Sequence, residues 1–276
     1  MDLHALTTLG QATVYPDTHD AGLLQPIPRR LAREALGLAG DGAAPLPFIG
    51  VDLWTHYELS WLEPGGKPVV AVGEIRVPAD SPALIESKSL KLYFNSLNFT
   101  RFATPADFTA LVEGELSQAA GAPVTLTLLP ADAPLRFGGL PGRCLDDLPL
   151  SIEDRREPDP GLLRCDPSRI VDETWHSHLL RSNCPVTDQP DWGSVVVRCH
   201  GPRIDPDSLL AYLVSFRRHA DFHEQCVERI FLDLQALTGA ALLTVHARYT
   251  RRGGLDINPF RSTAEELAGS WRTVRQ

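Results

Sequence analysis

The sequence lacks both the long apolar run of a membrane span and the leader of a secreted protein. No stretch of its 276 residues approaches the roughly 20 consecutive apolar residues that a transmembrane helix needs. The opening segment, MDLHALTTLGQ, has neither a basic region nor an apolar core, and a secretory signal would have both. We therefore expect a cytoplasmic protein that does not associate with membranes.

Positive charge is also scarce. Lysine and arginine number 26 against 35 aspartates and glutamates, which gives a formal net charge of −9. A surface of this sign repels nucleic acid unless a local basic patch overrides it. We therefore expect no direct contact with nucleic acid.

The cysteines lack the pattern of a disulfide framework. Their number is odd and no CxxC pair occurs, which argues against structural disulfides in a cytoplasmic protein. Each cysteine is then expected to be either a small buried hydrophobe or a working thiol. The five are Cys144, Cys165, Cys184, Cys199 and Cys226.

The glycine-rich signatures of nucleotide-binding folds are missing too. No GxGxxG follows a predicted strand, and GLAGDG near Gly37 has the wrong spacing and context. This argues against a Rossmann dinucleotide site and against a P-loop. Any dinucleotide must therefore be bound by another arrangement.

Two parts of the chain follow the same order of predicted elements. In the first, β-rich runs begin at Val51 and Pro68 on either side of the turn EPGGK, and SKSLKLYFNSLNF follows at helical spacing. Thr104 then caps a second helix that runs to about Ala120, and PVTLTLL closes the unit as a strand. The predicted order is ββααβ.

The second part repeats this order. SRIVDETWHSHLL and GSVVVRCHG are predicted strands that flank the loop RSNCPVTDQPDW. One helix is predicted from Asp205 to about Arg218 and another from Asp221 to a stop at Gly239. ALLTVHARY is the predicted last strand.

The repeated order predicts an α+β fold of two similar units, each with helices on one face of an antiparallel sheet. Residues 1–145, with an extended arm before Leu46, form the predicted N-terminal unit, and residues 146–276 form the C-terminal unit. A connector rich in Pro, Gly and Asp spans about residues 130–167 between them. A single mixed domain is the alternative.

The loop from Ser182 to Trp192 contains the first candidate for chemistry. Cys184 lies in a polar loop, which would give a thiolate access to a substrate. A carboxyl group a few residues on, that of Asp188 or Asp191, could act as a general acid if it is kept protonated. The alternative is that Cys184 is simply a small loop residue.

A second candidate is the segment His219–Cys226. His223 and Glu224 would pair a proton carrier with a carboxylate. The favoured alternative is a capping box between Asp221 and Glu224. A zinc site is the third alternative, because His219, His223 and Cys226 are spaced i, i+4 and i+7, although a helix boundary at Asp221 would break their common face.

Two further segments could hold an anion. Glu86–Lys91 marks a strand-to-helix transition, where lysines and free backbone N–H groups can bind phosphate, although a solvated turn capped by Ser87 or Ser89 is the simpler interpretation. Arg248–Gly254 follows a strand, and its arginines and glycine turn could clamp an anion. The alternative there is an ordinary surface turn.

Several long strings, taken in order, resemble one family. They are ESKSLKLYFNSLNFTRF, SNCPVTDQPDWGS, VSFRRHADFHEQCVERIF and ARYTRRGGLDINPFRS, with YPDTHDAGLLQPIPR and DLWTHYELSWL before them. This combination resembles the long, two-domain form of NADPH-dependent 7-cyano-7-deazaguanine reductase. The resemblance covers most of the chain and is thinnest between about residues 130 and 167.

The resemblance implies a tunnelling fold built from ββααβ units and a defined reaction. The family reduces a nitrile to 7-aminomethyl-7-deazaguanine, a precursor of the tRNA nucleoside queuosine. By resemblance, Cys184 attacks the nitrile carbon to give a covalent thioimide, and Asp191 supplies a proton to the nitrile nitrogen. Two NADPH molecules then deliver hydrides in succession.

The resemblance also implies which residues bind. NADPH would contact Lys88 and Ser89 in the first unit and Arg252 and Gly253 in the second. His223 and Glu224 would hold the deazaguanine and shuttle protons. No metal is expected, and the family suggests a homodimer. The implied substrate-binding residues are Glu86, Ser87, Lys88, Phe222, His223 and Glu224.

Two other functions compete with the reductase. Zinc-dependent relatives of the same fold, such as GTP cyclohydrolase I-like enzymes, hydrolyse a purine or pterin ring, and activity that persists in a chelator would exclude them. A non-catalytic purine-binding module is the second alternative. It would show no turnover, and Cys184→Ala would leave its ligand affinity nearly unchanged.

Overall fold

The computed structural model describes residues 15–38, 45–134, 137–267, 269 and 271–276, which form two compact units. Unit 1 comprises Asp52–Pro134, Arg251–Asp256 and the described chain up to Pro45. Unit 2 comprises the remainder. Leu46–Val51 thus groups with unit 2 and Arg251–Asp256 with unit 1, so the grouping of residues does not follow a single boundary after residue 145. No helix of the described chain is both long and apolar enough to cross a bilayer.

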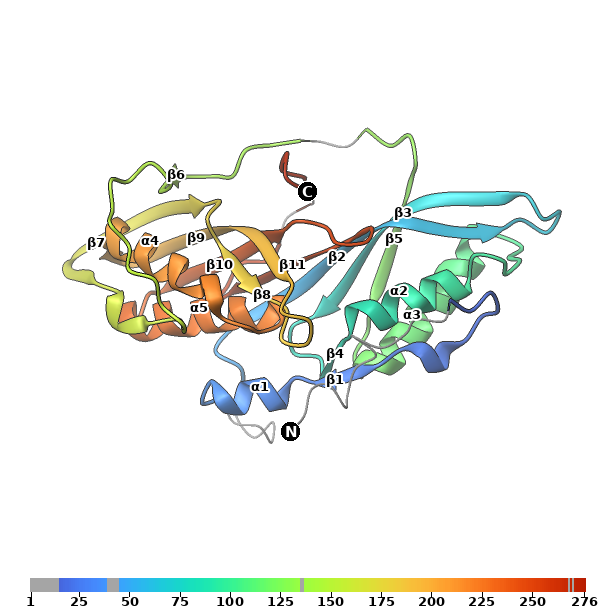
Figure 1. Ribbon diagram of the computed structural model, residues 1–276, viewed down its shortest axis with the longest axis horizontal. Coiled ribbons are helices and arrows are strands. Elements are labelled where there is room, and N and C mark those ends of the chain that lie inside the picture. Colours follow the sequence, from blue (N-terminus) through green and yellow to red (C-terminus); the bar gives the residue numbers. More distant parts are fainter. Residues whose placement is uncertain (1–14, 39–44, 135–136, 268, 270) are drawn as a thin grey trace. The chain divides into compact units, whose positions relative to one another are not determined.

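Unit 1 contains the strands and helices that the sequence predicts, and several that it does not (Figure 1). In the sheet, β3 lies between β2 and β5 and pairs antiparallel with β5. The described part of the N-terminal arm is not simply extended, because it contains a short strand, paired antiparallel with β4, and a helix. The elements are η2 (Ala21–Leu23), β1 (Pro26–Pro28), α1 (Arg30–Ala35), β2 (Ile49–Leu62), β3 (Pro68–Pro78), β4 (Ala83–Ile85), α2 (Ser87–Ser96), α3 (Pro105–Ala120) and β5 (Thr125–Pro130).

Helix α3 begins and ends where its sequence predicts. The Thr104 hydroxyl accepts a hydrogen bond from the Asp107 N–H at 3.2 Å, and the Asp107 carboxylate accepts from the Thr104 N–H at 2.9 Å. This reciprocal capping satisfies two N–H groups at the helix start. Gly121 ends the helix in the left-handed region at φ 72°, which glycine adopts without strain.

Unit 2 has the strand order β11-β10-β9-β7-β6, with β8 paired to β9. β8 lies within the predicted loop, and β11 was not predicted at all. The β11 sequence LDINPFRS contains Asp, Asn and Pro, which are poor strand formers, yet every residue in it is buried beside β10. The elements are β6 (Arg143–Cys144), η3 (Pro160–Leu162), β7 (Cys165–Ser177), β8 (Arg181–Asn183), β9 (Pro190–Ile204), α4 (Pro206–Ser215), η4 (Phe216–Arg218), α5 (His223–Thr238), β10 (Leu242–Tyr249) and β11 (Leu255–Ser262).

Helix α5 starts later than the sequence predicts, so the capping box expected between Asp221 and Glu224 is wrong. Its N-cap is Phe222. The Phe222 N–H donates to the side-chain oxygen of Gln225 at 3.4 Å and to Asp221 at 3.0 Å. The shift moves Gln225 into the capping position, which leaves Glu224 inside the first turn, where it is 2% exposed.

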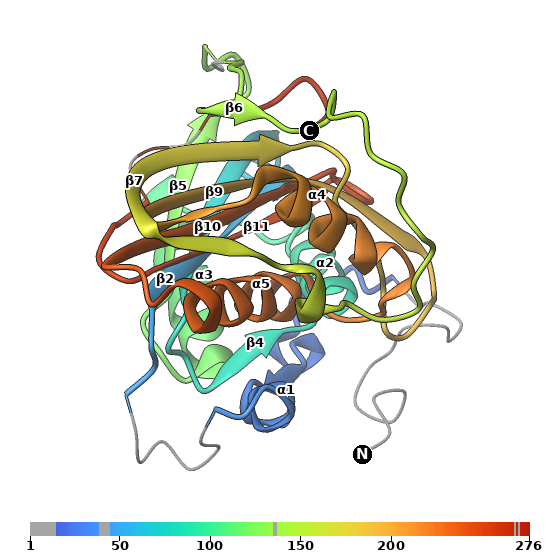
Figure 2. The same ribbon diagram turned by 90° about the vertical axis from the view of Figure 1, so that its left-hand side faces the viewer.

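Helices α4 and α5 lie on the same face of the unit 2 sheet (Figures 1 and 2). Alternation along β10 buries Val245, Ala247 and Tyr249 completely or nearly so. A buried ion pair ties α5 to β11, because Arg261 Nη2 lies 2.9 Å from Glu228 Oε1. This ion pair fixes α5 against the sheet.

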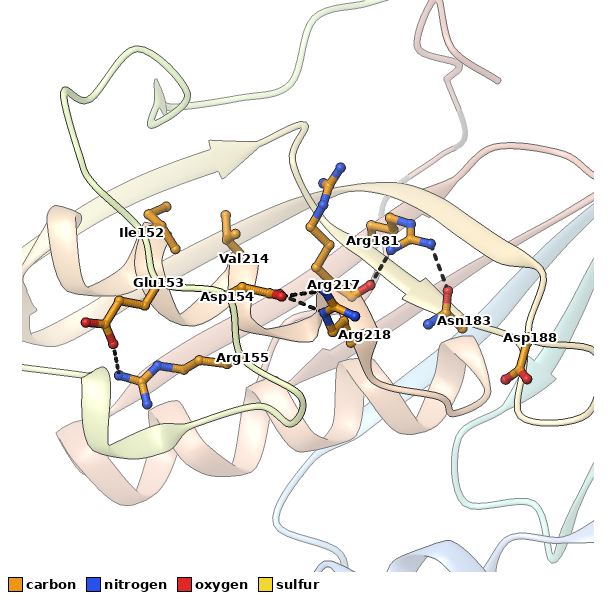
Figure 3. Close-up of a pocket in the computed structure, with 10 residues that line it drawn as sticks. All are labelled: Ile152, Glu153, Asp154, Arg155, Arg181, Asn183, Asp188, Val214, Arg217 and Arg218. Carbon is orange, nitrogen blue, oxygen red and sulfur yellow. Dashed lines mark hydrogen bonds and ion pairs between the residues drawn. The ribbon is translucent and has the colours of Figure 1, made fainter.

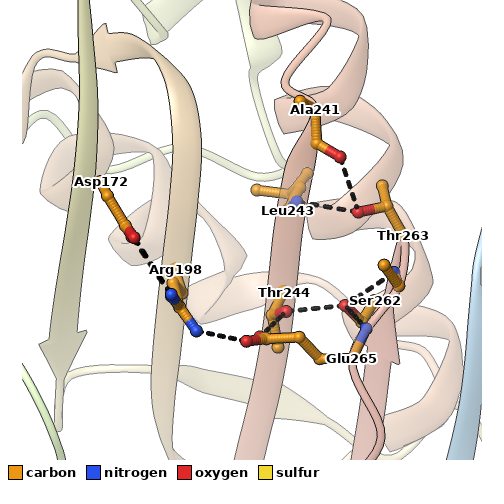
Figure 4. Close-up of polar contacts among 9 residues, drawn as sticks. Asp172, Arg198, Ala241, Leu243, Thr244, Ser262, Thr263 and Glu265 are labelled. Carbon is orange, nitrogen blue, oxygen red and sulfur yellow. Dashed lines mark hydrogen bonds and ion pairs between the residues drawn. The ribbon is translucent and has the colours of Figure 1, made fainter.

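A ladder of polar side chains links four strands of unit 2 (Figure 4). Arg198 on β9 makes two bonds to Asp172 on β7, at 3.1 and 3.2 Å, and also contacts Glu265. Glu265 accepts from the Thr244 hydroxyl on β10 at 2.6 Å, and Thr244 bonds Ser262 on β11 at 2.7 Å. The paired guanidinium of Arg198 lowers the pKa of Asp172. The ladder holds the strands in register.

The burial of two histidine rings leads us to expect that the protein loses stability in acid. Burial, with a nearby cation in each case, lowers the pKa of His56 and of His246 to about 3. Unfolding returns each ring to a pKa near 6.5, so the unfolded chain binds more protons and stability falls as pH drops from about 6.5 towards 3. Each histidine should add about 1.4 kcal/mol to the loss per pH unit.

The measurement is the free energy of unfolding by denaturant between neutral pH and pH about 4.5. In His56→Asn, the new amide oxygen can still accept the Glu58 N–H that His56 Nδ1 accepts at 3.0 Å. The free energy of unfolding of this variant should therefore fall less steeply with pH than that of the wild type, by about 1.4 kcal/mol per pH unit. Parallel curves for wild type and variant would contradict the assignment.

Candidate active site

Cys184 lies at the tip of a hairpin formed by β8 and β9. Ser182 pairs with Asp191 and Asn183 with Pro190. Beyond these pairs, the Cys184 N–H donates to the Gln189 carbonyl at 2.9 Å, and the Asp188 N–H donates to the Cys184 carbonyl at 3.0 Å. These backbone hydrogen bonds place Cys184 two residues beyond the Ser182–Asp191 pair.

The same hairpin is bonded to the segment that starts α5. The Asn183 N–H donates to the His219 carbonyl at 2.8 Å, and the Asp221 N–H donates to the Asn183 carbonyl at 3.1 Å. These bonds bring together two segments that are far apart in sequence. They place the Cys184 turn beside the residues that lead into His223.

The side chains of Cys184 and Asp191 are more enclosed than the sequence suggests. Cys184 is 4% exposed and Asp191 is 5% exposed, whereas a polar loop predicted an accessible thiol. The reason is that residues alternate along the hairpin, so Ser182 and Cys184 turn inward while Asn183 is only half-buried. A reactive thiol in this position is shielded from bulk water.

His223 joins this group from the first turn of α5. Its Nε2 lies 3.4 Å from Asp191 Oδ2. One face of its ring lies against Tyr249, with ring centroids 4.0 Å apart. Tyr249 comes from the end of β10, so three separate segments of unit 2 position the imidazole.

Buried side chains surround the hydroxyl group of Tyr249. Its hydroxyl lies beside the side chains of Ser182 and Cys226, all of which are at most 1% exposed. Burial raises the pKa of the Tyr249 hydroxyl and of the Cys226 thiol, so both stay neutral. Ser182 is also the strand partner of Asp191, which connects these side chains to the hairpin.

His219 anchors the connector to the same region. Burial by itself lowers its pKa, but the carboxylates of Asp221 and Glu157 outweigh that effect and raise it. His219 Nδ1 lies 2.7 Å from Glu157, and its Nε2 lies 3.5 Å from Asp221. The His219 ring thus joins the connector to the segment that pairs with Asn183.

A cluster able to hold a metal ion is not found among the described residues. His219, His223 and Cys226 could share a helix face only if one helix spanned all three, and α5 begins at His223. His219 precedes the helix and directs its ring nitrogens to Glu157 and Asp221. These three residues therefore do not share a helix face.

Glu86, rather than Ser87 or Ser89, caps α2 in unit 1. Its carboxylate accepts hydrogen bonds from the N–H groups of Lys88 and Ser89, both at 2.7 Å. Burial raises the pKa of Glu86 in spite of these bonds. The N–H groups expected to be free for phosphate are therefore already used by this carboxylate.

Ser87 and Lys88 remain half-buried at this helix start, whereas Ser89 is fully buried. The Ser89 hydroxyl donates to the Glu86 carbonyl at 2.7 Å and accepts from the Gln25 N–H at 3.1 Å. Ser89 thus has a structural task in unit 1. Its predicted contact with a cofactor stays a prediction.

The turn Arg251–Gly254 belongs to unit 1 and packs against α2. Gly253 has φ 54°, a left-handed conformation that glycine adopts without strain, and its backbone lies close to Lys91, because a Cβ there would be 2.2 Å from Lys91 Nζ. Lys91 in turn lies 3.9 Å from Glu58. Arg252 and Gly253 are therefore in the same unit as Lys88 and Ser89, although the sequence assigned them to different units.

Each unit thus gathers one group of the predicted residues. Unit 2 gathers the hairpin of Cys184 and Asp191 with Phe222, His223 and Glu224, and Phe222 is half-exposed at the start of α5. Sequence reasoning missed Tyr249 and Ser182 as supports of this group. Burial of Tyr249 follows from alternation along its strand, but its partner His223 could not be read from the sequence.

Two family models match the chain. The one described as nitrile reductase, 7-cyano-7-deazaguanine-reductase N-term, matches residues 15–128. The one described as QueF-like protein matches residues 190–268, a range that includes Asp191 and His223 and begins after Cys184. Together the two matches cover most of the chain in a two-domain order. The protein therefore belongs to the nitrile reductase family, whose members are 7-cyano-7-deazaguanine reductases.

Proposed function

We propose that this protein reduces the nitrile of 7-cyano-7-deazaguanine to an aminomethyl group with NADPH, through a thioimide on Cys184. The observation that carries the proposal is the group in unit 2 in which His223 contacts Asp191 at 3.4 Å beside the Cys184 hairpin. A nucleophile with a proton donor next to it is what addition to a nitrile requires.

In the first step the Cys184 sulfur adds to the nitrile carbon. A carbon–sulfur bond forms and one carbon–nitrogen π bond breaks, while Asp191 gives a proton to the nitrogen. The proton of the thiol passes to the Asp191–His223 pair, so the step is balanced without any leaving group. The enclosed position of both side chains limits competition from water.

NADPH, when bound, supplies a hydride in each of two reductions. The first reduction releases Cys184 as a thiol and leaves an imine-level compound, and the second gives the amine. The Asp191–His223 pair donates the accompanying protons. Tyr249 keeps the His223 ring in place throughout, because it packs against one face of that ring.

Unit 1 has the charge to hold the phosphates of NADPH. Lys88 and Lys91 on α2 and Arg252 in the adjacent turn are cationic, and the Gly253 backbone lies against Lys91 without an intervening side chain. A 2′-phosphate is best recognised by such cationic donors. Glu86, Ser87, Phe222 and Glu224 are the further residues that we propose for binding the deazaguanine.

The wider assignment follows from the same family. We propose that both units are tunnelling-fold ββααβ units, that the protein acts in the cytoplasm as a homodimer, and that its product enters queuosine biosynthesis. The direct test of the reaction is NADPH oxidation on adding 7-cyano-7-deazaguanine. Two NADPH should be consumed per nitrile, with or without a chelator, and no oxidation by folded protein would overturn the proposal.

Tyr249 is expected to act as a positioning residue. Tyr249→Leu removes the ring beneath His223 and should lower kcat about tenfold, with a displaced pH profile and little change in KM. Tyr249→Phe keeps the ring and should recover kcat to within about threefold of wild type. Equal losses in both variants, or a loss only in KM, would contradict this role.

A further inference from the structure

A polar cavity lies in unit 2 beside the Cys184 hairpin (Figure 3). Its volume is about 740 Å³, within the range of small-molecule sites. Arg181 and Asn183 of β8 and Asp188 of the turn line one side, and Arg217 and Arg218 of η4 line another. The residues that carry the proposed nitrile chemistry do not line this cavity.

The arginines of the cavity differ in what they already bind. Arg155 pairs with Asp159 at 2.8 Å, and Arg218 bonds Asp154 at 2.8 Å. By contrast, among the described residues no carboxylate lies within ion-pair distance of the Arg181 or Arg217 guanidinium. Figure 3 shows the Arg217 guanidinium turned away from Asp154, which Arg218 faces.

Trp192 organises these two arginines. The Arg181 guanidinium lies 5.5 Å and the Arg217 guanidinium 5.3 Å from the centre of the Trp192 ring. Arg181 also donates to the Arg217 carbonyl and, at 3.1 Å, to Asn183. Contact with an aromatic face holds a guanidinium while leaving N–H groups at its edge for an acceptor.

Two guanidinium groups held on one aromatic ring suit an anion with several oxygens. Phosphate offers these acceptors in a geometry that arginine bonds in pairs. Asp154 and Asp188 also line the cavity, and their carboxylates would repel an anion placed near them. Binding is therefore expected at the Arg181 and Arg217 guanidinium groups.

We infer that Arg181, Arg217 and Trp192 form a phosphate-binding site on unit 2, separate from the residues to which NADPH binding is assigned. Its ligand is a phosphoryl group, either of the dinucleotide co-substrate or of a free phosphate compound. Naming the co-substrate as a source rests on the proposed function. Arg181 donates to Asn183, which directly precedes Cys184. A ligand that holds Arg181 in place would therefore also stabilise the start of the turn that carries Cys184.

The test is calorimetric titration of wild type, Arg217→Gln and Arg181→Gln with 2′,5′-ADP and with pyrophosphate, and with adenosine as the uncharged control. Both probes should bind wild type, and each variant should bind at least one of them about tenfold more weakly. Arg218→Gln is the matched control, because its guanidinium is already paired with Asp154, and it should change affinity less than twofold.

The pattern of losses identifies the source of the phosphate. Weakened 2′,5′-ADP binding assigns the site to the co-substrate, and weakened pyrophosphate binding alone assigns it to a free phosphate compound. Unchanged affinities in both arginine variants, or equal losses in Arg218→Gln, would overturn the site. Because titration needs no nitrile, failure of the site is distinguishable from failure of nitrile turnover, which is measured separately by NADPH oxidation.

Discussion

Cys184→Ala is expected to abolish nitrile-dependent NADPH oxidation, with a loss of at least about 10⁴-fold. The physical reason is that hydride addition to a nitrile is slow unless the carbon is first activated, and alanine offers no nucleophile. The substitution removes one small side chain at a hairpin turn held by backbone bonds. Folding should therefore survive, and the variant should still bind the deazaguanine.

Mass spectrometry gives a second measurement that needs no NADPH. Addition to a nitrile expels no leaving group, so the wild-type chain should gain the full mass of the substrate, and Cys184→Ala should gain nothing. Cys144→Ala is the matched control, because that thiol is exposed on β6 and should leave both turnover and the adduct intact. An adduct that persists in Cys184→Ala would assign the nucleophile to another residue.

Asp191→Asn is expected to lower kcat by about a hundredfold or more. The amide keeps the size of the carboxyl group but cannot give the nitrile nitrogen a proton, and it cannot form an ion pair with His223. The effect should appear in kcat rather than in substrate affinity. Single-turnover kinetics should show slow formation of the covalent adduct.

Asp188→Asn is the control for this prediction. Asp188 lies in the same turn, is exposed, and adopts a left-handed backbone conformation at φ 53°, which asparagine tolerates as well as aspartate. Its substitution should leave kcat within about twofold of wild type. If Asp188→Asn lowered kcat as much as Asp191→Asn does, the effect would come from disturbing the turn. The role of Asp191 as proton donor would then be unsupported.

Local patterns predicted most of the helices correctly. Thr104 caps α3 and the helix ends at Ala120 as expected, and Asp205 and Gly239 act where the sequence placed a start and a stop. Such signals work because capping and the left-handed stop involve residues within one turn of each other. The start of α5 was misplaced because Asp221 and Phe222 are both compatible with a cap, and only packing chooses between them.

Longer-range features were missed for a different reason. β11 contains residues that disfavour strands, and its pairing with β10 and the Glu228–Arg261 ion pair override that local preference. β8 is too short to show a period, and it exists because β9 pairs with it. In both cases the stabilising hydrogen bonds come from a segment distant in sequence.

The sequence by itself determined the family, the order of the main elements and the identity of the candidate nucleophile and acid, because motifs and caps are local. Only the tertiary structure decided that Ser182 pairs with Asp191, that Tyr249 packs against His223, and that Arg251–Asp256 belongs to unit 1. These relationships depend on strand register and on packing between distant segments. A one-residue change of register would turn Asp191 away from His223, and no local pattern encodes that choice.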